Sequence, residues 1–360
     1  MATLIDSMAS LSSSPLSYRG RLAPSPTGYL HVGHARTFWT AYERARDAGG
    51  VLVMRMEDLD PDRSRAVYAE AALEDLRWLG IRWHEGPDLG GAYAPYAQSE
   101  RRPNYLAAWR KLLRGGFIYP CRCSRRDLEA ALSAPHEGGN QEQEPLDDEP
   151  VYPGTCRKEA DWMSRYPTLF ANRGPQRTDF VRWGGKNAKR MGHGDVSAHP
   201  AQDSFANGIE EPGSFNWRFR VPDGEAVEFV DLNLGPQRFV AGRDFGDFVV
   251  WRRDGIPSYQ LACVADDAAM KITEVVRGED LLKSTARQIL LNRALGLENP
   301  AWFHCRLVVD SNGKRLAKRH DALSLRMLRQ QGWTPDQILS DELRRETGVL
   351  QAAEKGLFPS

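Results

Sequence analysis

This 360-residue chain lacks a net charge, long apolar runs and abundant cysteine. Lysine and arginine number 48 together, as do aspartate and glutamate, so any nucleic-acid surface must be a local patch. The apolar stretches, such as 248–251, are far shorter than the ~20 residues of a membrane-spanning helix. Five cysteines argue against a disulfide framework. We therefore expect a cytoplasmic protein with no membrane contact.

Residues 1–18 contain no lysine or arginine, which a secretory signal or a transit peptide would require. This serine-rich segment is predicted to be a disordered tail. The remaining chain is long enough for two to three domains, and a hydrophobic content of 41% is enough for buried cores.

Apolar periodicity alternates between strand-like and helix-like segments, which favours an α/β fold with a parallel sheet. Serines at two positions, Ser99 and Ser284, are predicted to cap helices, and Gly296 to end the second of them. The expected strands cover 19–23, 51–56 and 272–277, and the expected helices begin near 35, 65, 99 and 284.

The segment 21–34 reads Arg-Leu-Ala-Pro-Ser-Pro-Thr-Gly-Tyr-Leu-His-Val-Gly-His. Its prolines and glycines predict a tight turn between the first strand and a helix. That turn would present His31, His34 and backbone N–H groups at the helix N-terminus, which favours anions.

A second segment, 314–319, reads Lys-Arg-Leu-Ala-Lys-Arg and follows an Asn-Gly turn. Such a cationic loop can place Lys318 as a point charge on phosphates. Together, the two segments indicate a site that activates a nucleotide.

These segments resemble the HIGH and KMSKS signatures of class I aminoacyl-tRNA synthetases. The motifs at 23–28, 55–60 and 276–281 match the glutamyl subgroup in the same order, so that the resemblance covers most of 19–321. It implies a Rossmann-like catalytic domain that uses ATP with Mg²⁺ to form an aminoacyl-adenylate. The chain departs from the pattern at Ala317, where family members usually have serine.

Charge suggests how such a site would hold glutamate. Arg21 and Arg277, at strand ends, can bind carboxylates, and Glu57 can take the ammonium group. For any one of these residues alone, a surface ion pair would be the simpler interpretation. The resemblance implies glutamate binding by Arg21, Leu22, Ala23, Pro24, Ser25, Glu57, Tyr259 and Arg277. It implies ATP binding by His31, Gly33, His34 and Lys318, with both histidines and Lys318 catalytic.

Cysteines form two groups in the sequence. Cys263 and Cys305 have apolar neighbours and are predicted core residues. Cys121, Cys123 and Cys156 offer three thiolates, one ligand short of a tetrahedral zinc site. Resemblance to the glutamyl-queuosine tRNA(Asp) synthetases, which are truncated relatives of the glutamyl-tRNA synthetases, supplies Tyr152 as the fourth ligand of a structural Zn²⁺.

The order of these motifs predicts a divided catalytic domain. Its halves would cover 19–120 and 241–330, with an inserted, zinc-bearing, acceptor-type subdomain at 121–240 and a short helical segment at 331–360. Within the insertion, 133–150 contains six acidic residues and no basic ones, which indicates a solvated loop. The segment 162–214 is a surface elaboration or a tRNA contact, because basic residues lie beside aromatic ones at Arg173, Arg177, Phe180, Arg182, Trp183, Lys186, Lys189 and Arg190.

The resemblance implies that the chain forms glutamyl-adenylate and transfers glutamate to the queuosine base in the anticodon of tRNA(Asp), acting as a monomer. The segment after Lys318 is expected to be too short for an anticodon-binding domain. Two alternatives stay open: a short glutamyl-tRNA synthetase that charges tRNA(Glu), and a non-catalytic regulator that binds glutamate or a nucleotide.

Overall fold

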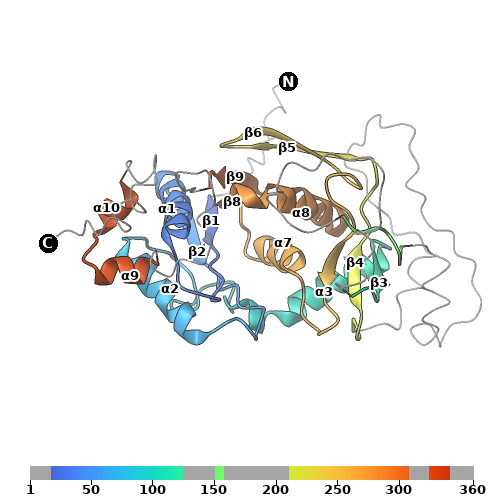
Figure 1. Ribbon diagram of the computed structural model, residues 1–360, viewed down its shortest axis with the longest axis horizontal. Coiled ribbons are helices and arrows are strands. Elements are labelled where there is room, and N and C mark those ends of the chain that lie inside the picture. The colour runs from blue at the N-terminus through green and yellow to red at the C-terminus, as the bar shows by residue number, and fades with distance from the viewer. Residues whose placement is uncertain (1–17, 125–150, 158–210, 308–323, 341–360) are drawn as a thin grey trace, which may run out of the picture.

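A computed structural model of the protein describes residues 18–124, 151–157, 211–307 and 324–340. In these residues, helices surround a set of mostly parallel strands at the middle of an elongated molecule (Figure 1). The expected tail at 1–17, most of both insertions, Ala317 and Lys318 lie outside the described residues.

Two pairs of parallel strands form the centre of the fold. Strand β1 (Arg19–Leu22) pairs with β2 (Val51–Met54), and β8 (Glu274–Gly278) pairs with β9 (Ala301–Cys305). The two pairs meet where β1 begins, because the Thr273 N–H donates to the Arg19 carbonyl at 2.9 Å. These strands confirm the α/β fold with a parallel sheet that the sequence indicated.

Beyond this first contact, β1 and β8 form no common ladder. Near their carboxyl ends a side chain joins them instead, since Arg21 Nη1 donates to the Val276 carbonyl at 2.8 Å. Parallel α/β sheets bind ligands at such a point, where two halves diverge beyond the carboxyl ends of their strands. The strand order therefore places the candidate site between β1 and β8.

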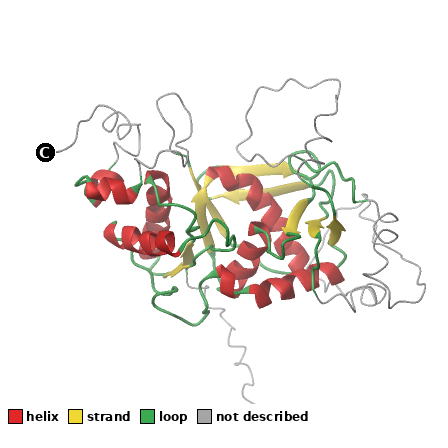
Figure 2. Cartoon of the chain, turned by 60° about the horizontal axis from the view of Figure 1, so that its bottom comes forward, coloured by secondary structure: helices red, strands yellow, loops and turns green. Residues whose placement is uncertain are grey.

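Helices cover both faces of this sheet (Figure 2), so most residues of its strands are buried, and β2 is apolar throughout. On β2, Leu52 and Met54 belong to one buried cluster and Val53 to the other. The first cluster includes the buried face of α1 (Val32–Asp47), and the second includes apolar residues of α3 (Arg102–Arg114), α7 (Tyr259–Ala269) and α8 (Leu282–Leu295).

A separate antiparallel sheet contains β3 (Ile118–Cys121), β4 (Asn216–Phe219) and β7 (Phe248–Trp251). It packs on α3 through tryptophans, with the rings of Trp109 and Trp217 at 5.0 Å between centroids. Strand β3 ends at Cys121, so this sheet carries the first predicted metal ligand.

A hairpin of β5 (Ala226–Asp231) and β6 (Gly235–Val240) joins the central sheet at Asp231, which pairs with Trp302 of β9. The strand pairing does not follow the expected domain boundary at residue 240. Strand β5 precedes residue 240 but pairs with β9 of the central sheet, and β7 follows residue 240 but pairs with β4 in the separate sheet. The domain limits themselves stay predictions.

One helix begins earlier than expected, and two predicted serine caps are wrong. The first helix begins at Val32, three residues earlier than expected, because His31 caps it. Ser99 caps no helix; its hydroxyl donates to Asp58 Oδ2 at 2.7 Å. Ser284 lies inside α8, where its hydroxyl accepts from Gln260 Nε2 at 2.9 Å. Gly296 ends α8 in the left-handed conformation, with φ 60°, as expected.

The remaining helices are α2 (Ala66–Trp78), α9 (Leu325–Gln330) and α10 (Pro335–Leu339). Leu325 of α9 lies close to α1, because its N–H donates to the Leu30 carbonyl at 2.7 Å. No helix among the described residues is both long and apolar enough to cross a membrane.

Candidate active site and metal centre

The two predicted histidines form the cap of α1. His31 Nδ1 accepts from the Gly33 N–H at 3.2 Å, and His34 Nδ1 accepts from the His31 N–H at 3.3 Å. Their rings lie 3.8 Å apart between centroids. Because each Nδ1 accepts a backbone hydrogen, the proton of each neutral ring is on Nε2. The cap therefore sets both histidines as Nε2–H donors at a helix N-terminus.

Arg21 and Glu57 meet through two charged residues that the sequence analysis did not select. Arg55 is fully buried and donates to Asp267 Oδ1 at 2.6 Å and to Glu57 Oε1 at 3.0 Å. Arg21 Nε lies 3.7 Å from the same Asp267 oxygen and has no hydrogen-bond partner among the residues that the structure describes. These four side chains hold two guanidinium groups and two carboxylates, so they form a neutral group.

The turn after β1 is held against the chain that follows β2. The Arg55 N–H donates to the Leu22 carbonyl at 2.8 Å, and the Glu57 N–H donates to the Pro24 carbonyl at 2.9 Å. These two bonds place the predicted segment from Arg21 to Ser25 beside Glu57. From this backbone, the Arg55 side chain donates to Glu57 two residues later, which accounts for the Arg-x-Glu pattern.

Arg277 is buried at the end of β8 and has a different environment. Its guanidinium donates to Gln288 Oε1 at 2.9 Å, Thr285 Oγ1 at 2.6 Å, His304 Nε2 at 3.2 Å and the Tyr259 hydroxyl at 3.4 Å. All of these partners are neutral. Among the residues that the structure describes, no carboxylate forms an ion pair with Arg277.

Tyr259 links Arg277 to the other charged residues. Burial raises the pKa of its hydroxyl, and the charge of Glu57 adds to this rise, whereas Arg277 and Arg21 oppose it. The hydroxyl of Tyr259 therefore lies in the electrostatic field of the predicted residues on β1, β8 and the chain after β2. The structure brings these predicted residues into one region.

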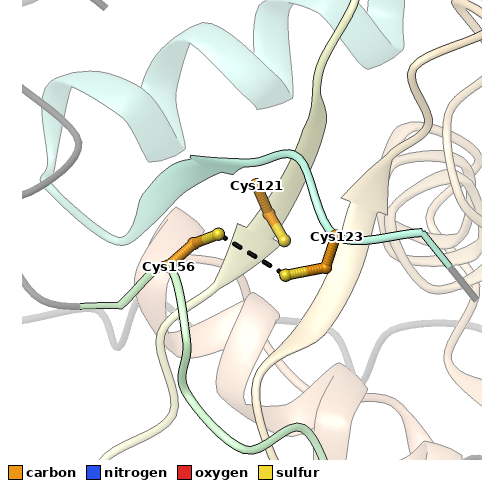
Figure 3. A group of neighbouring side chains, drawn as sticks. All are labelled: Cys121, Cys123 and Cys156. Carbon is orange, nitrogen blue, oxygen red and sulfur yellow. Dashed lines mark hydrogen bonds between the residues drawn. The ribbon is translucent and has the colours of Figure 1, made fainter. Parts of the chain in front are cut away.

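The predicted metal ligands also come together. The sulfur atoms of Cys121, Cys123 and Cys156 all lie within 4.8 Å of one another and point toward a common centre (Figure 3). The Tyr152 hydroxyl lies 3.5 Å from the sulfurs of Cys121 and Cys123. A Zn–S bond of ~2.3 Å in tetrahedral geometry requires sulfurs ~3.8 Å apart. This cluster has the size and the donor atoms that a metal ion requires.

Neighbouring residues hold the cluster in place. Arg218 Nε donates to Cys121 Sγ at 3.4 Å, and its guanidinium lies over the Tyr152 ring at 4.0 Å. Gly246 packs against Tyr152 so closely that a Cβ there would lie 2.8 Å from the Tyr152 backbone nitrogen. Cys263 and Cys305 are both buried, as predicted, although the Cys263 thiol also donates to Glu57 Oε1 at 3.4 Å and so lies at the candidate active site.

Some residues of the region gave no clear signal in the sequence. Arg55 is the exception, because it is the first residue of the 55–60 motif and could have been predicted from that motif. Asp267 and His304 lie within a helix and a strand, where nothing local distinguishes them from ordinary structural residues. They contact Arg55 and Arg277 only through the tertiary fold.

Comparisons with known proteins agree with this geometry. The family model "tRNA synthetases class I (E and Q), catalytic domain" matches residues 17–154 and 180–358. A glutamyl-Q tRNA(Asp) synthetase of Symbiobacterium thermophilum is 44% identical over 89% of this chain and 84% of its own. The enzyme of that name from Nitratidesulfovibrio vulgaris is 42% identical over 87% of this chain and 82% of its own.

Solved structures include the glutamate-tRNA synthetase of Elizabethkingia anophelis, at 29% identity and a TM-score of 0.59. The alignment covers 84% of this chain and 53% of that protein, so the present chain spans about half its length. The family model and these relatives cover most of the chain, which therefore belongs to the class I (E and Q) tRNA synthetases and carries their catalytic domain.

Proposed function

We propose that this protein activates L-glutamate with ATP and transfers it to the queuosine base in the anticodon of tRNA(Asp). The acceptor is inferred from the two relatives at 44% and 42% identity, both named glutamyl-Q tRNA(Asp) synthetases. The amino acid is inferred from the same names and from the charges between β1 and β8.

Arg277 carries the argument for glutamate. A buried guanidinium whose described hydrogen-bond partners are all neutral favours an anion from outside the chain. A carboxylate placed between Nη1 and the Tyr259 hydroxyl would accept hydrogen bonds from both. Arg21, whose Nε has no partner, would bind the other carboxylate, and Glu57 would bind the ammonium group.

ATP would bind at the start of α1. The Nε2–H groups of His31 and His34 and the backbone at Gly33 would contact its phosphates, and Mg²⁺ would accompany the nucleotide. We assign Lys318 to the departing pyrophosphate, where its charge would stabilise the transition state of adenylate formation.

A zinc ion would bind Cys121, Cys123, Cys156 and Tyr152. Thiolates select zinc over the harder divalent cations, and a complete set of four ligands is typical of a structural ion. In that role, the ion would hold the end of β3, at Cys121 and Cys123, against the segment 151–157. We assign it no part in the chemical step.

The experiment that tests the acceptor uses radiolabelled glutamate and ATP. We expect the purified protein, which we propose acts as a monomer, to glutamylate an anticodon stem-loop of tRNA(Asp) that carries queuosine. The same RNA with guanine at that position is the matched control and should stay unlabelled. Binding should weaken as salt increases, because phosphate contacts dominate affinity for RNA.

The competing function is the charging of tRNA(Glu). Label that appeared only at the 3′ end of full-length tRNA(Glu) would show that the protein is a glutamyl-tRNA synthetase instead. An absence of glutamate-dependent exchange between pyrophosphate and ATP would leave only the non-catalytic alternative.

A further inference from the structure

A chain of buried polar groups lies behind Arg277. Asp231, at the end of β5, and His304, in β9, are joined by a contact of 2.6 Å between Asp231 Oδ2 and His304 Nδ1. The other ring nitrogen, Nε2, faces Arg277 Nε at 3.2 Å. Both Asp231 and His304 are at most 1% exposed.

Hydrogen bonding determines the tautomer of His304. Arginine can only donate, so Nε2 of the histidine must accept, and its single proton is on Nδ1 facing the carboxylate. Asp231 is held in turn by the backbone N–H groups of Asn233 and Leu234, at 3.0 and 2.8 Å from Oδ1. The turn between β5 and β6 therefore fixes which atom of the imidazole faces Arg277.

The groups around His304 keep the ring neutral. Burial and, after it, the nearby charges of Arg277 and Arg21 together lower its pKa to about 4, against the opposing effect of Asp231. The other groups that face it are neutral, including the hydroxyl of Thr285 at 3.0 Å from Nε2. At neutral pH, Nε2 is thus a hydrogen-bond acceptor.

We infer that Asp231 and His304 are positioning residues for substrate choice: they hold the Arg277 guanidinium in the orientation that selects a side-chain carboxylate over the isosteric amide. This inference rests on the proposed function, in which Arg277 binds glutamate, and it further assigns the side-chain carboxylate of glutamate to Arg277 and the α-carboxylate to Arg21. His304 is suited to the role because a neutral acceptor fixes the guanidinium without neutralising it. A carboxylate in its place would cancel the charge that selects glutamate.

Two substitutions at the same position separate this role from a structural one. His304→Asn retains an amide near Nδ1, facing Asp231, but loses the acceptor facing Arg277. His304→Gln retains an acceptor near Nε2. Both remove the ring and leave a buried amide, so they form a matched pair. Each variant is compared with the unmodified chain for thermal unfolding, for calorimetric binding of glutamate and glutamine, and for glutamate-dependent exchange between pyrophosphate and ATP.

We expect His304→Asn to weaken glutamate binding about ten- to a hundred-fold, which is typical of losing a hydrogen bond to a charged group. Its preference for glutamate over glutamine should narrow, while the KM for ATP stays the same. His304→Gln should stay within a few-fold of the unmodified chain. In an Arg277→Ala background, His304→Asn should cause no further loss, because it acts through Arg277.

Equal losses in the two variants, or an undiminished loss in the Arg277→Ala background, would show that His304 is only structural. The proposed function is judged separately from the unmodified chain. If that chain binds glutamate without catalysing exchange, the activation step fails and the variants still test the inference by calorimetry. If it binds no glutamate, the proposed function and the inference are both wrong.

Discussion

Two buried arginines, Arg218 and Arg277, show how different surroundings give the same side chain different uses. Each is 4% exposed, and each lies over an aromatic ring, that of Tyr152 or Trp302. Arg218 contacts a cysteine of a cluster that can become anionic, whereas Arg277 contacts a hydroxyl, an amide and an imidazole. Thiolates of the cysteine cluster can thus match the charge of Arg218, whereas no carboxylate among the described residues pairs with Arg277, as its proposed role in binding a ligand requires.

The largest effect that tests this comparison concerns Arg277. Arg277→Ala should weaken glutamate binding by about 2–5 kcal/mol, because a buried carboxylate would lose its charged partner. The KM for ATP and the metal content should not change. Titration calorimetry and metal analysis of the same preparation would measure both quantities. Unchanged affinity for glutamate would remove Arg277 from the site.

Replacing Arg218 should lower the affinity for the metal and leave the affinity for glutamate unchanged. Arg218→Met keeps most of the side-chain volume but removes the hydrogen bond to Cys121 and the charge over Tyr152. Loss of such an outer contact typically lowers metal affinity ten- to a hundred-fold, which is about 1.4–2.8 kcal/mol. Competition with a chelator would measure this change, with Cys123→Ser as the control that should lose the metal altogether. A drop in glutamate affinity without a change in metal affinity would contradict the comparison.

The smallest expected effect concerns a buried carboxyl group that accepts no hydrogen bond from any described residue. Asp75, on α2, is 0% exposed, and neither carboxylate oxygen has a hydrogen-bond partner. Burial raises the pKa of Asp75 to about 6, although Arg326 and Arg329 oppose the rise. Below the unfolded pKa of ~3.9 the carboxyl is protonated in both states, so the penalty is absent there and grows as pH rises toward 6.

Asp75→Asn should therefore stabilise the protein at pH 7 by about 1–2 kcal/mol and have little effect at pH 4. Urea unfolding at both pH values would measure the difference. Glu70→Gln, at an exposed position of the same helix, is the matched control and should show no such dependence. A gain in stability of equal size at both pH values would show that ionisation of Asp75 is not the cause.

Local signals in the sequence predicted the elements that local chemistry determines. Strand β1 and the end of α8 at Gly296 follow from neighbouring residues, and the structure places them as expected. Ser99 and Ser284 were wrongly predicted as helix caps, because each hydroxyl has a partner more distant in the chain, Asp58 or Gln260. A serine predicts a cap only where no tertiary partner competes for it.

The candidate site was only partly predictable for the same reason. Recognisable motifs contain or adjoin Arg21, Glu57 and Arg277. The residues that surround these three in the fold belong to no motif. Asp267 is more than 200 positions from Arg55 in the sequence, and no local pattern indicates their contact. Such partners decide whether a guanidinium is neutralised or remains charged, so the motifs predicted the ligand groups but not their electrostatic roles.

The junction between β1 and β8 has a mechanical consequence. At its start, the two strands are held by a backbone bond and by Glu274, which Tyr18 and Arg44 both contact. At its carboxyl end, the hydrogen bond from Arg21 to the Val276 carbonyl replaces the missing ladder. Arg21 therefore joins the carboxyl ends of the two strands and, in the proposed function, would also contact the substrate. A substitution of Arg21 would remove both contacts at once, so its effect on the sheet could not be separated from its effect on the ligand.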